Sequence, residues 1–141
     1  AIAAFGYLIY CIVVQRLQIH AEEEIGSERR RTTAKLYTYM GLLLWKDFES
    51  TRDSRYREEA IHATERAHTY ASELDERDLK NERIIATVRN NLAWYLANRG
   101  RPQDRGKARW YAQYIHTRSQ NFPEEREEWE ATYREIMRAY P

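Results

Sequence analysis

The sequence contains little of what breaks helices or cross-links a chain. Among its 141 residues there are one cysteine, three prolines and five glycines. Because Cys11 is alone, an internal disulfide and a cysteine-based zinc cluster are both excluded. The scarcity of proline and glycine favours long helices, and 43% apolar residues are enough to bury the core of one globular domain. Wholesale disorder is therefore excluded.

The motifs of common enzymes are also missing. There is no His-Glu-x-x-His zinc motif, no glycine-rich loop for a phosphate and no Gly-x-Ser-x-Gly nucleophile elbow. The Glu-x-x-His spacing of di-iron bundles occurs at Glu59–His62 and Glu65–His68, but both copies fall on one predicted helix. Positions six residues apart on a helix point about 120° away from each other. We predict no enzyme activity, no catalytic residue, no metal, no cofactor and no small-molecule substrate.

An uncharged apolar run occupies residues 1–14. As a helix this run would rise about 21 Å, less than the ~30 Å hydrocarbon core of a bilayer. Three interpretations are open: part of a membrane anchor within residues 1–25, a helix buried against the domain, or a remnant of a signal peptide. In the first, the membrane-facing residues are Phe5, Tyr7, Leu8, Ile9, Ile12 and Val13.

Arginine residues follow the apolar run, at Arg16 and again at positions 29–31. The tendency of positive charge to stay on the cytoplasmic side predicts a membrane-associated protein whose remaining chain faces the cytoplasm. The alternative location is that of a soluble cytoplasmic protein.

From residue 28 onward, apolar residues recur at spacings of three and four, which is the period of an α-helix. No segment alternates with a period of two over the length of a strand, so we predict an all-α fold of five to six helices. The predicted core positions, helix by helix, are Leu36, Met40, Leu43, Leu44 and Phe48; Tyr56, Ala60, Ala63, Ala67, Ala71 and Leu74; Ile85, Val88, Leu92 and Leu96; Ala108, Tyr111, Ala112 and Ile115; and Trp129, Tyr133, Ile136 and Tyr140.

Capping residues predict where these helices begin and end. Gly26 is expected to end the first helix, Asp53 to cap the start of the third, and Gly100 to end the fourth. Pro123 suits the first turn of the last helix. The predicted organisation is an apolar N-terminal helix over 1–25 and a helical domain over 28–141, with hairpins at 28–75 and 82–120 and a final helix at 123–140.

The apolar pattern of the domain repeats. A shift of 48 residues superposes apolar positions on one another: Leu36 on Ile84, Met40 on Val88, Leu44 on Leu92, Phe48 on Leu96, Ala60 on Ala108 and Ala67 on Ile115. Such a repeat is typical of antiparallel helical hairpins stacked as a short α-solenoid, in which neighbouring hairpins complete one another's core.

One stretch of the second hairpin resembles a known family. The residues Asn-Asn-Leu-Ala-Trp-Tyr-Leu-Ala at 90–97, followed by Gly100, Ala108 and Ala112, resemble the A-helix, turn and B-helix of a tetratricopeptide repeat. The resemblance is best over residues 82–122, and its period of 48 exceeds the family's 34. The family resemblance implies a concave groove, lined by A-helices, that binds peptides or protein segments.

Charge is balanced overall but unevenly distributed along the chain. The formal net charge is +1, yet residues 83–118 contain eight basic residues and one acidic residue, Asp104. Most of these basic residues are arginines, whose planar guanidinium suits carboxylates and phosphates. An acidic segment of a protein partner is therefore expected, and the alternative is a solvated helix face.

These observations predict a non-catalytic protein–protein interaction module. Under the anchor interpretation it is tethered to a membrane through residues 1–25 as an accessory or scaffold subunit of a complex. The candidate partner-binding residues are Arg89, Asn90, Asn91, Arg99, Arg105, Arg109 and Trp110. The alternative is a soluble helical-repeat domain that binds RNA or another acidic ligand through the basic segment. Nucleic acid is the less favoured partner because the overall charge is balanced.

Overall fold

The computed structural model describes the backbone of residues 2–141 and the side chains of residues 12–141. Within this range the chain forms five α-helices and no β-strand, which confirms the predicted all-α class. The elements are α1 (Ile2–Thr51), α2 (Ser54–Ala71), α3 (Leu79–Arg99), α4 (Pro102–Arg118), the short 3-10 helix η1 (Ser119–Asn121) and α5 (Arg126–Ala139).

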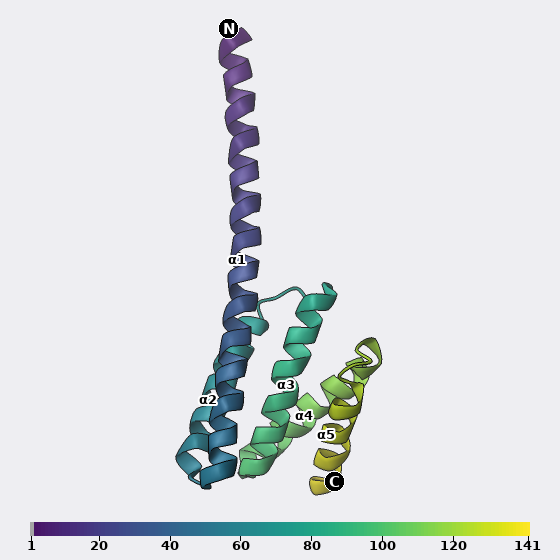
Figure 1. The fold of residues 1–141 in the computed structure, drawn as a ribbon. Helices are drawn as coiled ribbons and strands as arrows, with labels where there is room; N and C mark the ends of the chain where they lie inside the picture. Colours follow the sequence, from purple (N-terminus) through teal and green to yellow (C-terminus); the bar gives the residue numbers. More distant parts are fainter. Residues whose placement is uncertain (1) are drawn as a thin grey trace.

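Successive α-helices run in alternating directions and pack against one another (Figure 1). Helix α1 packs along α2, α2 along α3, α3 along α4, and α4 along α5. Contacts also join α1 to α3 and α3 to α5. In Figure 1 the helices α1, α3 and α5 lie in order across the view, with α4 behind α3 and α5. One layer of the molecule therefore consists of α1, α3 and α5.

Two helix boundaries lie where the sequence predicts them: a polar residue caps the start of α2, and a glycine ends α3. The Asp53 carboxylate accepts a hydrogen bond from the backbone N–H of Arg55 at 3.0 Å and caps α2. Gly100 has a φ of 70°, in the left-handed region that favours glycine, and ends α3. The predicted position of Pro123 is wrong, because α5 begins only at Arg126 and the preceding turn is anchored by the fully buried Phe122.

The predicted helix end at Gly26 is also wrong. Helix α1 continues through this position for 50 residues, from Ile2 to Thr51. A single glycine costs a helix only about 1 kcal/mol relative to alanine, which is too little to break a long helix without a proline or a competing cap. The next turn is supported by an ion pair between Glu28 and Arg31 at 2.7 Å.

The first half of α1 extends beyond the other helices (Figure 1). Ile12 and Val13 are 44% and 50% exposed, and Leu17, Ile19 and Ile25 are exposed as well. These five side chains are therefore not buried against the domain. The side chains of Phe5, Tyr7, Leu8 and Ile9 lie outside the described residues. No helix in the described part of the chain is both long and apolar enough to cross a membrane.

Within the bundle, the buried face of α1 agrees only in part with the predicted one. Leu36, Met40 and Leu43 were expected in the core, but Leu36 is 63% exposed and the other two are also exposed. Phe48 is buried as predicted, and the buried face also contains Ala34, Gly41 and Trp45. Helix α1 thus has two apolar faces at helical spacing, and the one with small residues packs because it lets α2 approach closely.

Gly41 lies at a close contact between α1 and α2. A methyl group at this position would collide with the Thr64 hydroxyl and lie 3.2 Å from the carbonyl oxygen of Ala60. We expect Gly41→Ala to lower the free energy of unfolding by about 1 kcal/mol, because the overpacking cost exceeds the gain in helix propensity.

Urea denaturation of Gly41→Ala measures this effect, with Gly26→Ala as the matched control. A methyl group at Gly26 has no neighbour within 4 Å, so the control should be neutral or slightly more stable than the parent. Adding Thr64→Ala to Gly41→Ala should restore part of the loss. An equal effect of both glycine substitutions would contradict the close helix contact.

Candidate functional site

Arg99, a predicted partner-binding residue, is engaged inside the chain. Its Nε donates to Asp104 Oδ2 at 2.7 Å and its Nη2 to Oδ1 at 2.8 Å, while Nη1 donates to Glu58 at 2.9 Å. The Asp104 side chain is only 3% exposed, and its hydrogen bonds with Arg99 hold the pKa of that carboxyl below its usual range. Arg99 therefore joins the end of α3 to α2 and α4.

Arg89 is a second member of the predicted set that lies inside the fold. It is 9% exposed, and its guanidinium carbon lies 4.0 Å from the ring centroid of Tyr114 and 4.9 Å from that of Trp110. Its Nε donates to His68 Nε2 at 3.3 Å. Arg89 thus links α3 to α4 through cation–π contacts and to α2 through the histidine.

The contact with Arg89 requires a neutral His68, because Nε2 can accept a hydrogen bond only when it is deprotonated. Burial and the nearby charge of Arg89 lower the pKa of His68. The native state then binds fewer protons than the unfolded state, so we expect stability to be complete above about pH 6.5 and to fall as the pH drops below it.

Melting temperatures between pH 8 and pH 5 measure this dependence of stability on pH. A His68→Gln variant should lose the part of the dependence that His68 contributes. A protein whose melting temperature has the same pH profile with and without His68 would contradict the assignment.

The remaining predicted residues fall on two faces of the molecule. Asn90 is 4% exposed and its Nδ2 donates to Glu128 on α5 at 3.3 Å, while Asn91 is half-buried beside it. On α4, Arg105 is exposed near the ring of Tyr140, Arg109 donates to the carbonyl of Pro141 at 3.4 Å, and Trp110 is 53% exposed. The structure therefore does not gather the seven residues into one surface.

The asparagines lie in a groove formed by α1, α3 and α5. One cavity of about 430 Å³ lies mainly between α1 and α3. Its apolar wall includes Leu42 and Ile84, and Lys35 and Arg83 contribute charged groups. The full set of lining residues is Lys35, Thr38, Tyr39, Leu42, Arg83, Ile84, Thr87, Asn91 and Glu128.

A second cavity, of about 340 Å³, continues this groove toward α5. The two cavities share Leu42, Asn91 and Glu128, so they form one continuous feature. The second is lined by Leu42, Trp45, Glu49, Asn90, Asn91, Trp94, Tyr95, Glu128, Ala131, Thr132 and Glu135. Sequence reasoning found the two asparagines and missed the contributions of α1 and α5, which only the packing of the three helices brings together.

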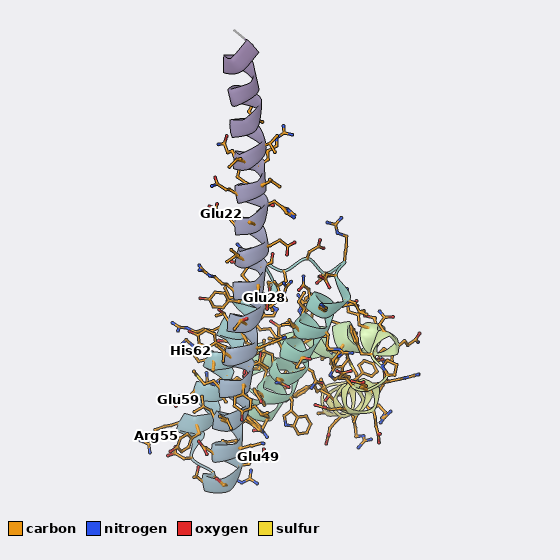
Figure 2. All side chains as sticks on the ribbon, turned by 45° about the horizontal axis from the view of Figure 1, so that its top comes forward. Glu22, Glu28, Glu49, Arg55, Glu59 and His62 are labelled. Atoms are coloured by element: carbon orange, nitrogen blue, oxygen red, sulfur yellow. The ribbon has the colours of Figure 1, made fainter. Side chains whose placement is uncertain are left out.

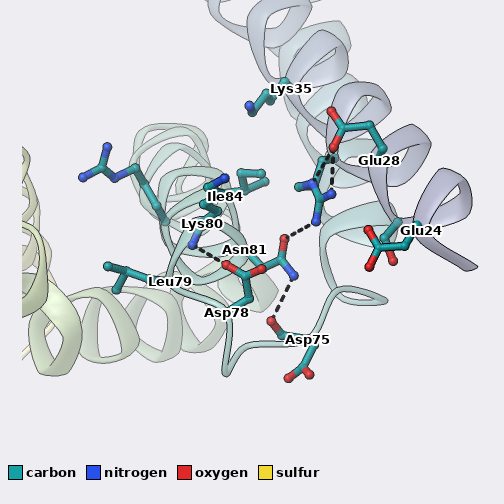
Figure 3. Close-up of a pocket in the computed structure, with 12 residues that line it drawn as sticks. Glu24, Glu28, Lys35, Asp75, Asp78, Leu79, Lys80, Asn81 and Ile84 are labelled. Atoms are coloured by element: carbon teal, nitrogen blue, oxygen red, sulfur yellow. Dashed lines mark hydrogen bonds and ion pairs between the residues drawn. The ribbon is translucent and has the colours of Figure 1, made fainter.

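A third and larger cavity, of about 850 Å³, lies between α1 and the turn that precedes α3 (Figure 3). Its charged groups are of both signs, and several of them make hydrogen bonds across the cavity. Arg31 pairs with Glu28 and donates to Asn81, whose Nδ2 donates to the carbonyl of Asp75 at 3.1 Å. Asp78 caps the start of α3 by accepting from the backbone N–H of Lys80. These contacts attach α1 to the turn.

The histidine and glutamate pairs on α2 do not form a cluster. Figure 2 shows Glu59 and His62 on the outer side of α2, where both are exposed. Among the residues that the structure describes, no group of three or more His, Cys, Asp or Glu side chains is placed to hold a metal ion.

Comparison with known proteins adds no family to this description. No protein-family model matches the chain, and neither the curated proteins nor the solved structures give a match. The groove and its residues are therefore the basis for the functional argument.

Proposed function

We propose that the chain is a non-catalytic protein–protein interaction module that binds a peptide segment of its partner in the groove of α1, α3 and α5. In this proposal α1 with α2 and α3 with α4 are two tetratricopeptide-like hairpins, and α5 is the first helix of a third. The observation that carries the proposal is the pair of continuous cavities along the layer formed by the first helix of each unit.

The dimensions and the lining of the groove suit a peptide. Each cavity falls within the range of about 300–1,000 Å³ that is typical of ligand sites. Leu42 and Ile84 offer an apolar wall, while Asn91 and Glu128 supply polar groups where the two cavities meet. An extended segment with alternating apolar and polar side chains could fill both cavities at once.

The groove replaces the basic segment as the favoured partner surface. The guanidinium of Arg99 donates through all three nitrogens to Asp104 and Glu58, and that of Arg89 is 9% exposed and donates through Nε to His68. A partner could therefore bind these two side chains only by displacing contacts within the chain. Arg105, Arg109 and Trp110 on α4 support the alternative of an acidic ligand or RNA. That alternative places binding on α4 instead of on α1, α3 and α5.

A membrane tether is the second part of the proposal. Its support is the apolar run of residues 1–14, which continues without a helix break into the α1 helix of the bundle. Exposed Ile12, Val13 and Leu17 extend the apolar surface along the projecting part of α1. The helix would then hold the groove away from the bilayer surface. In a flotation assay with phosphatidylcholine vesicles, the whole chain should rise with the vesicles, and a chain that lacks residues 1–25 should not.

Selection from a random peptide library displayed on phage tests the peptide-binding function. Selected peptides should perturb the amide NMR signals of groove residues such as Thr38, Thr87 and Ala131. Perturbation confined to Arg105, Arg109 and Trp110 would support the alternative surface on α4. A library that yields no binding peptide would overturn the proposed function.

A further inference from the structure

The cavity next to α5 combines aromatic rings with carboxylates. Trp45 and Tyr95 stack in its wall, with ring centroids 4.3 Å apart, and Trp94 beside them is 37% exposed. Three carboxylates line the same cavity, those of Glu49 on α1 and of Glu128 and Glu135 on α5. Indole faces and carboxylates both attract a cation.

These carboxylates have no ion-pair partner among the described side chains. The lining of the cavity contains no lysine, arginine or histidine, and none of the three glutamates forms an ion pair with another described side chain. All three are exposed, so water now solvates them. An incoming cation would therefore not have to displace an internal partner.

The side-chain amide of Asn90 lies in the cavity wall, and no group donates a hydrogen bond to its oxygen among the described residues. Asn90 is 4% exposed, and its Nδ2 donates to Glu128, which fixes the side-chain amide in the cavity wall. Its Oδ1 is buried and has no partner among the described residues. A buried acceptor without a donor is unfavourable, so a ligand that brings an N–H group to this oxygen would be stabilised there.

We propose that this acidic and aromatic cavity binds an arginine side chain of the partner peptide. A guanidinium carries five N–H donors in a plane, which suits several acceptors around one site better than an ammonium group does. The acceptors that line the cavity are the carboxylates of Glu49, Glu128 and Glu135, and the partly exposed ring of Trp94 adds a π face. The unpaired oxygen of Asn90 is buried in the wall of the same cavity. This proposal rests on the proposed peptide-binding function and specifies its partner.

The neighbouring cavity adds a second requirement. Because it meets the acidic cavity at Leu42, Asn91 and Glu128, a bound peptide would place an apolar residue there, close in sequence to its arginine. The partner segment is then basic and apolar, the opposite of the acidic segment that the charge distribution of the sequence predicts.

Peptides from the phage library test the inference through one chemical substitution. Citrulline has nearly the shape of arginine but no charge, so a selected peptide made with citrulline should bind at least tenfold more weakly than its arginine form. The binding should also weaken with added salt, because the carboxylates are exposed. Equal affinity of the two peptides would overturn the inference.

Two variants of α5 locate the effect in the cavity. Glu128→Gln keeps an oxygen that can accept a hydrogen bond from Asn90 and removes one negative charge. The variant should bind the arginine peptide about tenfold more weakly and the citrulline peptide with unchanged affinity. Glu127→Gln removes an exposed charge from the adjacent position, which does not line the cavity, and should have no effect. Equal losses in both variants would overturn the inference.

The selection also separates this inference from the function on which it rests. Peptides that bind in the groove without a shared arginine leave the peptide-binding function standing and overturn the inference alone. A library without any binding peptide overturns both.

Discussion

Replacement of Arg99 by alanine should lower the free energy of unfolding by about 3 kcal/mol or more. Arg99 is the only residue that donates side-chain hydrogen bonds to both oxygens of the Asp104 carboxylate within the described residues. Without it, the Asp104 carboxylate, which is 3% exposed in the native structure, would keep only the hydrogen bond from the backbone N–H of Arg101 at 3.3 Å among those of the described residues. Breaking a buried ion pair costs more than the pair contributes, because one desolvated charge is left behind.

Urea unfolding measures this prediction, and Arg101→Ala is the control. Arg101 also contacts Glu58, at 3.4 Å, but its side chain is 50% exposed, so its removal should cost less than about 1 kcal/mol. Similar losses for the two arginines would contradict a buried structural role for Arg99.

The dependence of stability on acidic pH also tests the ion pair of Arg99 and Asp104. Because the pKa of Asp104 is lowered in the native state, its contribution to stability is complete above its unfolded pKa of about 3.9 and is lost as the pH falls below that value. Arg99→Ala should remove most of this acid-dependent loss, since the hydrogen bonds that lower the pKa are then absent.

The second large effect concerns binding. Thr87→Trp should lower the affinity for a selected peptide about a hundredfold, which corresponds to a loss of about 2.7 kcal/mol in binding free energy. Thr87 lines the first cavity, where an indole would occupy the space of the peptide side chain. Its hydroxyl donates only to the carbonyl of Arg83 on the same helix, so the substitution should spare the fold.

Thr69→Trp is the matched control for this substitution. Thr69 is exposed on α2 and also donates to the carbonyl four residues earlier, that of Glu65. This control should bind the peptide with the affinity of the parent chain. Fluorescence anisotropy of a labelled peptide measures both variants, and equal affinities would contradict the position of the groove.

Local sequence signals predicted most of the helices well, but they did not predict the length of α1. Period and caps placed the ends at Asp53 and Gly100, because a cap depends on residues adjacent in the chain. Gly26 was misleading because its cost to a helix is small and nothing packs against it. The length of α1 is set by the absence of a stronger stop before Arg52, whose φ of 57° follows the last helical residue.

The choice of buried face on α1 could not be read from hydrophobicity alone. Leu36 and Met40 are more apolar than Gly41, and a period of three and four includes them. Burial follows how closely α2 can approach, which depends on the missing side chain of Gly41 and on the small side chain of Ala60 on α2. Such a contact joins residues far apart in the chain.

The candidate site was predicted in part for a similar reason. Asn90 and Asn91 lie in the groove because the motif that contains them sits on α3, between the other two helices of the layer. Glu128 comes from α5, and no spacing rule relates it to the asparagines. The net charge of the segment does not show which of its arginines are free: Arg89 and Arg99 bond internally, while carboxylates of α1 and α5 line the second cavity.

Photo-crosslinking tests the central claim, that a peptide binds along α1, α3 and α5, most directly. Benzoylphenylalanine would replace Thr38 on α1, Ala131 on α5 or, as the control, Thr69 on α2, and the labelled peptide would be irradiated with each variant. The groove predicts crosslinks from the first two positions and none from the third. A crosslink from Thr69 alone, or equal yields at all three positions, would contradict it.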